Sequence, residues 1–169
     1  IVSELTFEKY RNKIYSFSEN VMYVEFEDED LLFNKIAKLN EDLKWDSRIN
    51  IEKTLENILQ IAINNKLKDY EIPDILIVTD MDFDDALVNH DLYNEIYLKF
   101  YNKFFHEGIK NIGTPWKVPF IKYWNIKGDF SVTLNNKVKN MKIYRGYSQM
   151  LFEHIIFNKE LNCQETEVT

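Results

Sequence analysis

The chain has 169 residues and a formal net charge of −7, with 45% hydrophobic and 29% charged residues. This length suits one domain with a real core, and the composition excludes an intrinsically disordered chain. The acidic charge argues against direct binding of nucleic acid through its phosphates. The single cysteine, Cys163, excludes an internal disulfide and suits a reducing compartment. No apolar run is long enough to span a membrane.

Apolar spacing divides the first half of the chain into helices and one hairpin. It predicts a helical start over 1–12, an antiparallel hairpin from strands 13–18 and 21–26, and helices over 32–42 and 51–66. The last of these has the cleanest apolar face, and Asn50 is a good N-cap for it. The acidic run that follows the hairpin reads as a solvated loop.

The stretch 75–79 (Ile-Leu-Ile-Val-Thr) has no polar break and follows Pro73. Such a run is typical of a strand that is buried on both faces of a parallel sheet. Four carboxylates follow it, those of Asp80, Asp82, Asp84 and Asp85. Because sites in open α/β sheets collect at the carboxyl ends of strands, we expect a functional rim there.

The second half alternates helices and strands. We expect a helix over 91–106 closed by Gly108, strands over 120–126, 130–134 and 141–144, and a final helix capped by Ser148. This alternation predicts a doubly wound, mostly parallel α/β sheet with helices on both faces. The residues beyond 158 form a polar tail.

Six blocks of the chain, in this order and spacing, carry a resemblance to a known family. They are SEL at 3–5, YSFSEN at 15–20, Trp45, VTDMDFDDA at 78–86, PFIKYWNI at 119–126 and YRGYSQMLFEHI at 144–155. Together they resemble the von Willebrand factor A-like C-terminal domain of an uncharacterised, TROVE/Ro-related family found in eukaryotes and large DNA viruses. The resemblance covers nearly the whole chain and implies the doubly wound fold.

The resemblance also implies a position for a metal-ion-dependent adhesion site. Such a site combines an Asp-x-Ser-x-Ser loop, a Thr from a second loop and an Asp after a later strand, and it holds Mg²⁺. Asp80 matches the last of these elements. Ile49 stands where the family has Thr and offers no oxygen, and Asn50 stands where the family has Asp. We therefore expect a degenerate or absent metal site, with Asp80 as the one carried-over ligand.

In the family, the first element of that site lies upstream of the residues that match 2–5. Ile1 to Leu5 would then be the tail of the first helix, and the first strand, which belongs beside 75–79, would be missing from this chain. The chain begins with Ile1 rather than Met, so we expect a piece of a longer protein. We expect a preceding segment or another chain to complete the sheet. The domain is expected over 1–158 and the tail over 159–169.

An enzymatic alternative comes from the same carboxylates. Asp-x-Asp after a buried strand opens the phosphatases of the haloacid dehalogenase type, with a nucleophile at Asp80 and an acid-base at Asp82. The next alternate position is Asp84, where those enzymes use Thr or Val. A Mg²⁺-dependent phosphoryl-transfer enzyme is therefore the second hypothesis.

The favoured hypothesis is a non-catalytic module of a larger intracellular, cytoplasmic protein, or of a virion if the source is viral. It would bind a protein partner at the carboxyl-end rim. The expected partner-binding residues are Asn50, Asp80, Asp82, Asp84, Asp85, Trp116, Tyr147 and Ser148. Trp116, in a loop between two prolines, is expected to be exposed, whereas Trp124, within a strand, is expected in the core.

Overall fold

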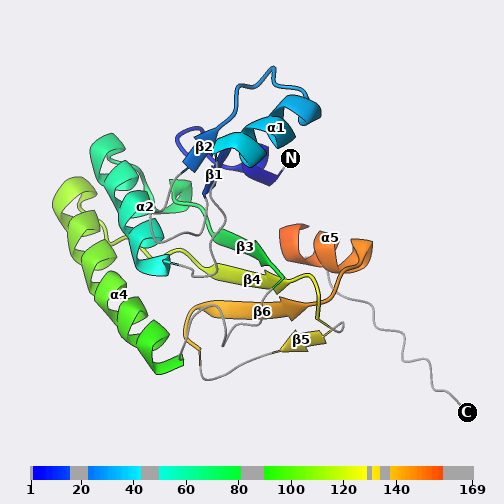
Figure 1. Ribbon diagram of the computed structural model, residues 1–169. Helices are drawn as coiled ribbons and strands as arrows, with labels where there is room; N and C mark the ends of the chain where they lie inside the picture. Colours follow the sequence, from blue (N-terminus) through cyan, green and yellow to red (C-terminus); the bar gives the residue numbers. More distant parts are fainter. Residues whose placement is uncertain are drawn as a thin grey trace, which may run out of the picture.

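The computed structural model describes residues 2–15, 23–42, 50–80, 90–128, 131–133 and 138–157 (Figure 1). The short helical turns are η1 (Val2–Leu5) and η2 (Asp69–Glu71), and the helices are α1 (Leu32–Asp42), α2 (Ile51–Asn65), α4 (His90–Ile112) and α5 (Gln149–Phe157). The strands are β1 (Lys13–Tyr15), β2 (Tyr23–Glu25), β3 (Ile75–Thr79), β4 (Ile121–Asn125), β5 (Ser131–Thr133) and β6 (Met141–Arg145).

The described strands form a four-stranded sheet and a separate hairpin. The sheet has the order β3-β4-β6-β5. Its first three strands are parallel, and β5 pairs antiparallel with β6. The hairpin pairs β1 with β2 in antiparallel register, which confirms that prediction. The fold is thus mixed α/β with a parallel three-strand centre.

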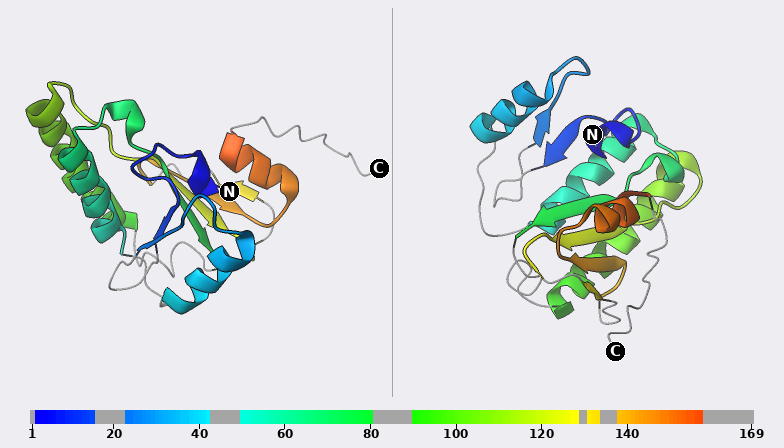
Figure 2. Two further views of the ribbon diagram at one scale, coloured as in Figure 1. Left: turned by 90° about the horizontal axis from the view of Figure 1, so that it is seen from above. Right: turned by 90° about the vertical axis from the view of Figure 1, so that its right-hand side faces the viewer.

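Helices cover both faces of the larger sheet (Figure 2, left). On one face α2 and α4 enclose the main core, to which the sheet contributes Ile77, Ile121, Tyr123, Met141 and Ile143. On the other face α5 packs against Trp124 and Tyr144 through Leu151 and Ile155. Alternate residues of each strand therefore serve opposite faces, as the pleat requires.

The helix α2 follows its sequence prediction closely. Asn50 Oδ1 accepts a hydrogen bond from Lys53 N–H, which confirms the N-cap. The predicted apolar face packs on the core: Ile63 is half-buried, and the buried members are Ile51, Leu55, Ile58, Leu59 and Ala62. Ion pairs from Glu52 to Lys99 and from Glu56 to Lys103 connect α2 to α4 along their exposed sides.

The predicted helical start over 1–12 is wrong beyond the turn η1. Tyr10 is buried, and its hydroxyl donates to Ile58 O at 2.9 Å. Asn12 has φ 60, and its N–H donates to Ser3 O. These two contacts fold the segment back in turns, because burying Tyr10 against α2 is incompatible with a continuous helix.

The helix α4 continues past Gly108 and ends before Gly113, which has φ 79. The prediction that Gly108 closes the helix is therefore wrong. A Cβ on Gly108 would lie 2.4 Å from Trp116 N and 2.7 Å from Thr114 O. Glycine is needed there because another segment of backbone crosses the helix at that point.

The two central strands differ in burial. β4 is buried on both faces, as predicted. In β3 only Ile77 is fully buried, and the side chain of Val78 is 51% exposed. The prediction that 75–79 is buried on both faces is therefore wrong for the described residues, because β3 is the outer strand of the described sheet.

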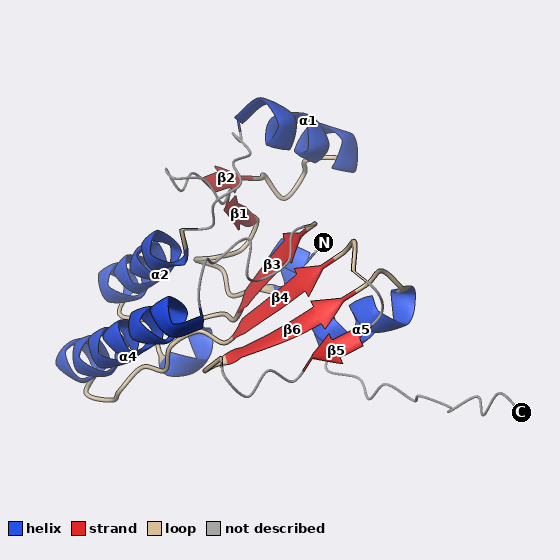
Figure 3. Cartoon of the chain, turned by 60° about the horizontal axis from the view of Figure 1, so that its bottom comes forward, coloured by secondary structure: helices blue, strands red, loops and turns tan. Residues whose placement is uncertain are grey.

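The pairing of β3 also fixes which of its backbone groups point outward. Ile75 N–H donates to Phe120 O, and Thr79 O accepts from Ile126 N–H. Since a parallel strand directs alternate residues to opposite neighbours, the N–H and C=O groups of Leu76 and Val78 face the other edge. Figures 1 and 3 show the β1–β2 hairpin on that same side of β3.

Within the described part of the chain, no helix is both long and apolar enough to cross a membrane.

Candidate functional site

The carboxyl ends of β3, β4 and β6 meet at one edge of the sheet, and we call the residues that follow them the rim: Asp80, Asn125 to Gly128, and Gly146 to Ser148. Asp80 follows β3 directly, and its side chain is 53% exposed. Its carboxylate lies 2.6 Å from Lys127 Nζ. The hydrogen bond from Lys127, together with its positive charge, holds the pKa of Asp80 below its ordinary value.

The turn that presents Lys127 is built by Asn125. This side chain is buried, and its Oδ1 accepts hydrogen bonds from Lys127 N–H at 2.9 Å and Gly128 N–H at 3.2 Å. Its carbonyl accepts from Gly146 N–H at 2.9 Å. One asparagine therefore fixes the turn after β4 and ties it to the end of β6.

An aromatic pair lies beside that turn. Trp124 is buried, and its Nε1–H donates to Gly146 O at 2.7 Å. The ring of Tyr147 stacks on Trp124 with centroids 6.2 Å apart and an interplanar angle of 2°. Tyr147 is nevertheless 80% exposed. The rim thus displays one open aromatic face on a rigid support.

Ser148 has a structural task. Its Oγ accepts a hydrogen bond from Leu151 N–H at 3.1 Å, and its carbonyl accepts from Phe152 N–H. It is the N-cap of α5, as predicted. Ser148 therefore lies at the rim because α5 begins there.

Asn50 was also predicted for the site. Within the described ranges, Asn50 bonds to its own helix and makes no hydrogen bond to Asp80 or Tyr147. Asp82, Asp84 and Asp85 lie outside the described residues.

The burial of Trp116 differs most clearly from what was predicted. It is 2% exposed and lies at the amino-terminal ends of the strands, where its Nε1–H donates to Leu67 O at 2.8 Å. The prediction of an exposed contact is wrong, because the indole fills the space between α4 and the segment after α2. The flanking prolines shape the segment that inserts it.

The described residues show no cluster of three or more His, Cys, Asp and Glu side chains that could hold a metal ion. Asp80 is the one described member of the expected set, and Lys127 already neutralises its carboxylate. A cation at Asp80 would first have to displace that ammonium group. Among the described residues, the rim therefore offers a ligand one ion pair, Asp80–Lys127, and the exposed ring of Tyr147.

Comparison with known families identifies the chain at the level of its domain. The model of a domain of unknown function, DUF7788, matches residues 1–169. The chain belongs to this family. No curated protein and no solved structure matches it. The family carries no assigned activity, so the role of this DUF7788 domain rests on its own residues.

Lys127 and Asn125 were not among the site residues predicted from the sequence. Lys127 and Asn125 together control Asp80 and the turn after β4. The signal for them was a Lys-Gly pair after a buried strand, which marks a tight turn near the strand end. Nothing in the spacing from Asp80 indicated that this lysine would reach it.

Proposed function

We propose that this domain is a non-catalytic protein-interaction module of a larger intracellular protein. A protein partner binds at the rim and covers Tyr147 and the Asp80–Lys127 pair. The observation that carries this proposal is the exposed Tyr147 ring on the buried Trp124, since aromatic side chains held rigidly at a surface are the usual anchors of interfaces.

The rim supports binding better than catalysis. Asp80 is exposed and paired with a lysine, whereas a nucleophile or acid-base needs a free group in an enclosed site. A protein partner can bind this ion pair, either through a carboxylate that contacts Lys127 or through a cationic side chain that contacts Asp80. Charge pairs at the edge of an interface set orientation and association rate more than affinity.

The finer architecture belongs to the same proposal. We infer that one further strand, from a preceding segment of the longer protein or from another chain, pairs with the open edge of β3 and completes a von Willebrand factor A-like sheet. The outward backbone groups of Leu76 and Val78 support this, since no described strand pairs with them and an unpaired, uncharged edge strand is a liability that proteins usually cover.

Two buried polar atoms in the first part of the chain also support the presence of an additional neighbouring segment. Asn12 Oδ1 and Tyr15 Oη are buried and have no hydrogen-bond partner among the described residues. Buried polar atoms are nearly always paired, so each calls for a partner. Both residues lie at or next to β1, in the hairpin that Figures 1 and 3 place beside the edge of β3.

Site-specific photocrosslinking tests the rim. A photoreactive phenylalanine analogue replaces Tyr147 in one sample and Tyr70 in a matched control. These tyrosines are 80% and 77% exposed, but Tyr147 follows the carboxyl end of β6 and Tyr70 precedes the amino end of β3. We expect a discrete crosslinked protein from position 147 that is lost when Asp80→Lys is added. Equal crosslinking from both positions would remove the rim as the binding surface.

A further inference from the structure

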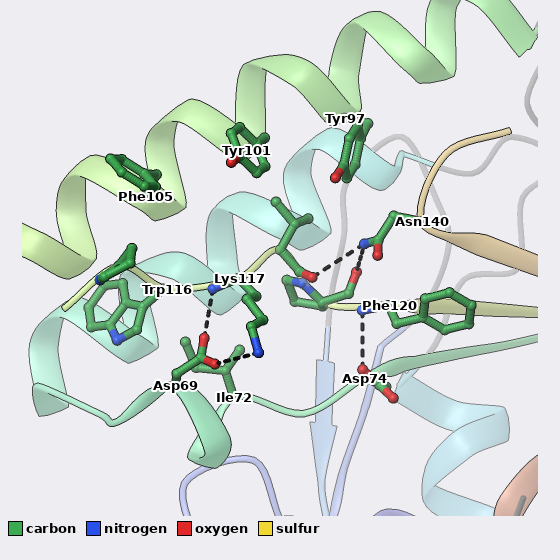
Figure 4. Close-up of a pocket in the computed structure, with 13 residues that line it drawn as sticks. Asp69, Ile72, Asp74, Tyr97, Tyr101, Phe105, Trp116, Lys117, Phe120 and Asn140 are labelled. Atoms are coloured by element: carbon green, nitrogen blue, oxygen red, sulfur yellow. Dashed lines mark hydrogen bonds and ion pairs between the residues drawn. The ribbon is translucent and has the colours of Figure 1, made fainter.

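A groove of about 500 Å³ lies at the amino-terminal ends of β3 and β4, the opposite end of the strands from the rim (Figure 4). One wall is α4, and the other is the extended segment 115–120 that leads into β4. Asp69 and Asp74 also line the groove, next to the segment 115–120. The rim proposal uses none of these residues.

The α4 wall carries a ladder of aromatic rings. Tyr97, Tyr101 and Phe105 are one helical turn apart, with ring centroids 6.2 Å and 6.3 Å apart. Tyr101 is 47% exposed and Phe105 36% exposed. The main core is filled by other aromatic residues of α4, such as Phe100 and Phe104. Tyr97 also packs against the main core, whereas Tyr101 and Phe105 continue the stripe as exposed rings.

The facing wall is fixed at its first end by Gly108 and Trp116. The backbone of 114–116 lies directly on Gly108, where no side chain would fit. Trp116 is buried and bonded to Leu67 O. This end of the wall therefore cannot move without breaking the core.

Hydrogen bonds hold the rest of the wall. Lys117 N–H donates to Asp69 at 2.7 Å, and Phe120 N–H donates to Asp74 at 3.1 Å. Asn140 Nδ2 donates to Pro119 O at 2.8 Å. These bonds engage the wall's own polar groups, so the groove presents mainly ring and aliphatic surface. A preformed groove binds without the cost of ordering its walls.

The groove is lined by more negative than positive side chains. Asp69 accepts from Lys117 N–H and lies 3.6 Å from the Lys117 ammonium, whose side chain is 89% exposed. Asp74 is exposed, and its contact among the described residues is the backbone N–H of Phe120. Two carboxylates against one ammonium favour a ligand that carries positive charge.

We propose that this groove binds a proline-rich peptide segment with a basic residue at one end. A polyproline II helix rises about 3.1 Å per residue, so two residues advance about 6 Å, which matches the spacing of the rings. Prolyl rings occupy the gaps between Tyr97, Tyr101 and Phe105. The tyrosine hydroxyls donate to peptide carbonyls, and Asp74 receives the basic side chain.

Fluorescence anisotropy with a labelled synthetic peptide tests this proposal. The probe is a short peptide of Pro-Pro-Leu-Pro repeats ending in arginine, and two further peptides replace the prolines by glycine or the arginine by glutamate. We expect saturable binding of the first peptide at micromolar concentration. The glycine and glutamate peptides should bind at least about tenfold more weakly, a difference of about 1.4 kcal/mol.

Two variants on α4 locate the binding. Tyr101→Ala should weaken the peptide about tenfold, as expected of an interface anchor. Leu98→Ala is the control, because Leu98 is 48% exposed on the same helix and does not line the groove. Asp74→Asn keeps an acceptor for Phe120 N–H and should reduce affinity and its dependence on salt.

Three results would overturn the proposal: no binding of the arginine peptide, equal binding of the glycine peptide, or equal loss in the Leu98 and Tyr101 variants. The rim variant Tyr147→Ala should leave peptide affinity unchanged. Failure here is therefore distinguishable from failure of the rim proposal.

Discussion

Trp124 and Tyr147 lie parallel at the end of the sheet, with an interplanar angle of 2°, yet the first is buried and the second is 80% exposed. The stacked pair therefore divides structural support and surface contact between two residues. Trp124 contributes to folding, and Tyr147 is available for contact.

This separation predicts different outcomes for two truncations. Trp124→Ala should lower the free energy of unfolding by about 3–5 kcal/mol, because it empties a buried site. Tyr147→Ala should lower it by less than about 1 kcal/mol, because the ring is exposed. Urea denaturation monitored by circular dichroism measures both. Similar losses for the two variants would show that Tyr147 is structural.

Replacing Gly108 by alanine should reverse the usual sign of a helix substitution. Gly→Ala inside a helix normally stabilises by about 1 kcal/mol. Here the new Cβ would meet the backbone of Trp116 and Thr114, so we expect a loss of about 1–3 kcal/mol in unfolding free energy. Trp116 fluorescence should shift at the same time.

Gly113→Ala is the control for that experiment. Its position has φ 79, but nothing lies within 4 Å of the added Cβ. It should cost about 1–2 kcal/mol through backbone strain alone and leave the tryptophan spectrum unchanged. A stabilised Gly108 variant would contradict the packing described for the segment after α4.

The hydroxyls of Tyr10 and Tyr15 offer a test of sheet completion. Tyr10→Phe should lower the unfolding free energy by about 1 kcal/mol, because the hydroxyl bonds to Ile58 O. Tyr15→Phe should be neutral or stabilising in residues 1–169, because its buried hydroxyl lacks a partner among the described residues. A clear loss for Tyr15→Phe in residues 1–169 would argue against the proposed additional neighbour.

Tyr15 also predicts behaviour at high pH. Burial raises the pKa of Tyr15 to about 12, above its ordinary value of 10.0. The unfolded chain therefore loses this proton first as the pH rises. The free energy of unfolding is unaffected by this group below pH 10 and falls between about pH 10 and 12, because the folded state resists ionising the buried hydroxyl. Denaturation midpoints across this range should fall less steeply for Tyr15→Phe than for the wild type.

The Asp80–Lys127 pair predicts the opposite pH dependence. Lys127 lowers the pKa of Asp80, so its contribution is present above the unfolded pKa and fades as acid protonates the carboxylate. Carbon-detected NMR titration should give Asp80 a pKa below that of a free aspartate. Lys127→Met should raise it toward that value. An unchanged pKa in this variant would mean that the two groups are apart in solution.

Magnesium titration separates the binding hypothesis from its alternatives. We expect no saturable heat from Mg²⁺, and no Mg²⁺-dependent hydrolysis of a generic phosphate ester, because Lys127 occupies the Asp80 carboxylate. Saturable heat that Asp80→Asn removes would restore the metal-dependent adhesion hypothesis. Hydrolysis that the same variant abolishes would favour the phosphoryl-transfer enzyme.

The sequence predicted those elements whose signal is local. The amphipathic face of α2, its cap at Asn50 and the cap at Ser148 are all set by neighbours within one helical turn. Features that depend on distant segments were missed. Gly108 looked like a helix end, although a segment folded over α4 explains it. Trp116 looked exposed for the same reason.

The rim and the groove likewise combine features that are set by local sequence with features that depend on distant segments. The position of Asp80 after a strand was readable, but its lysine partner was not, since that contact joins the ends of two different strands. Tyr97 packs against the main core. Only the fold shows that it continues into an open ladder with Tyr101 and Phe105.

Among the described residues no strand pairs with the outer edge of β3, and this affects how the purified protein behaves in solution. Residues 75–79 carry no charge and no proline, which elsewhere discourage neighbouring molecules from adding on. A concentrated recombinant preparation of this domain alone should form soluble oligomers and then precipitate. Val78→Lys places an ammonium group at the exposed position of that strand and should keep the preparation monodisperse.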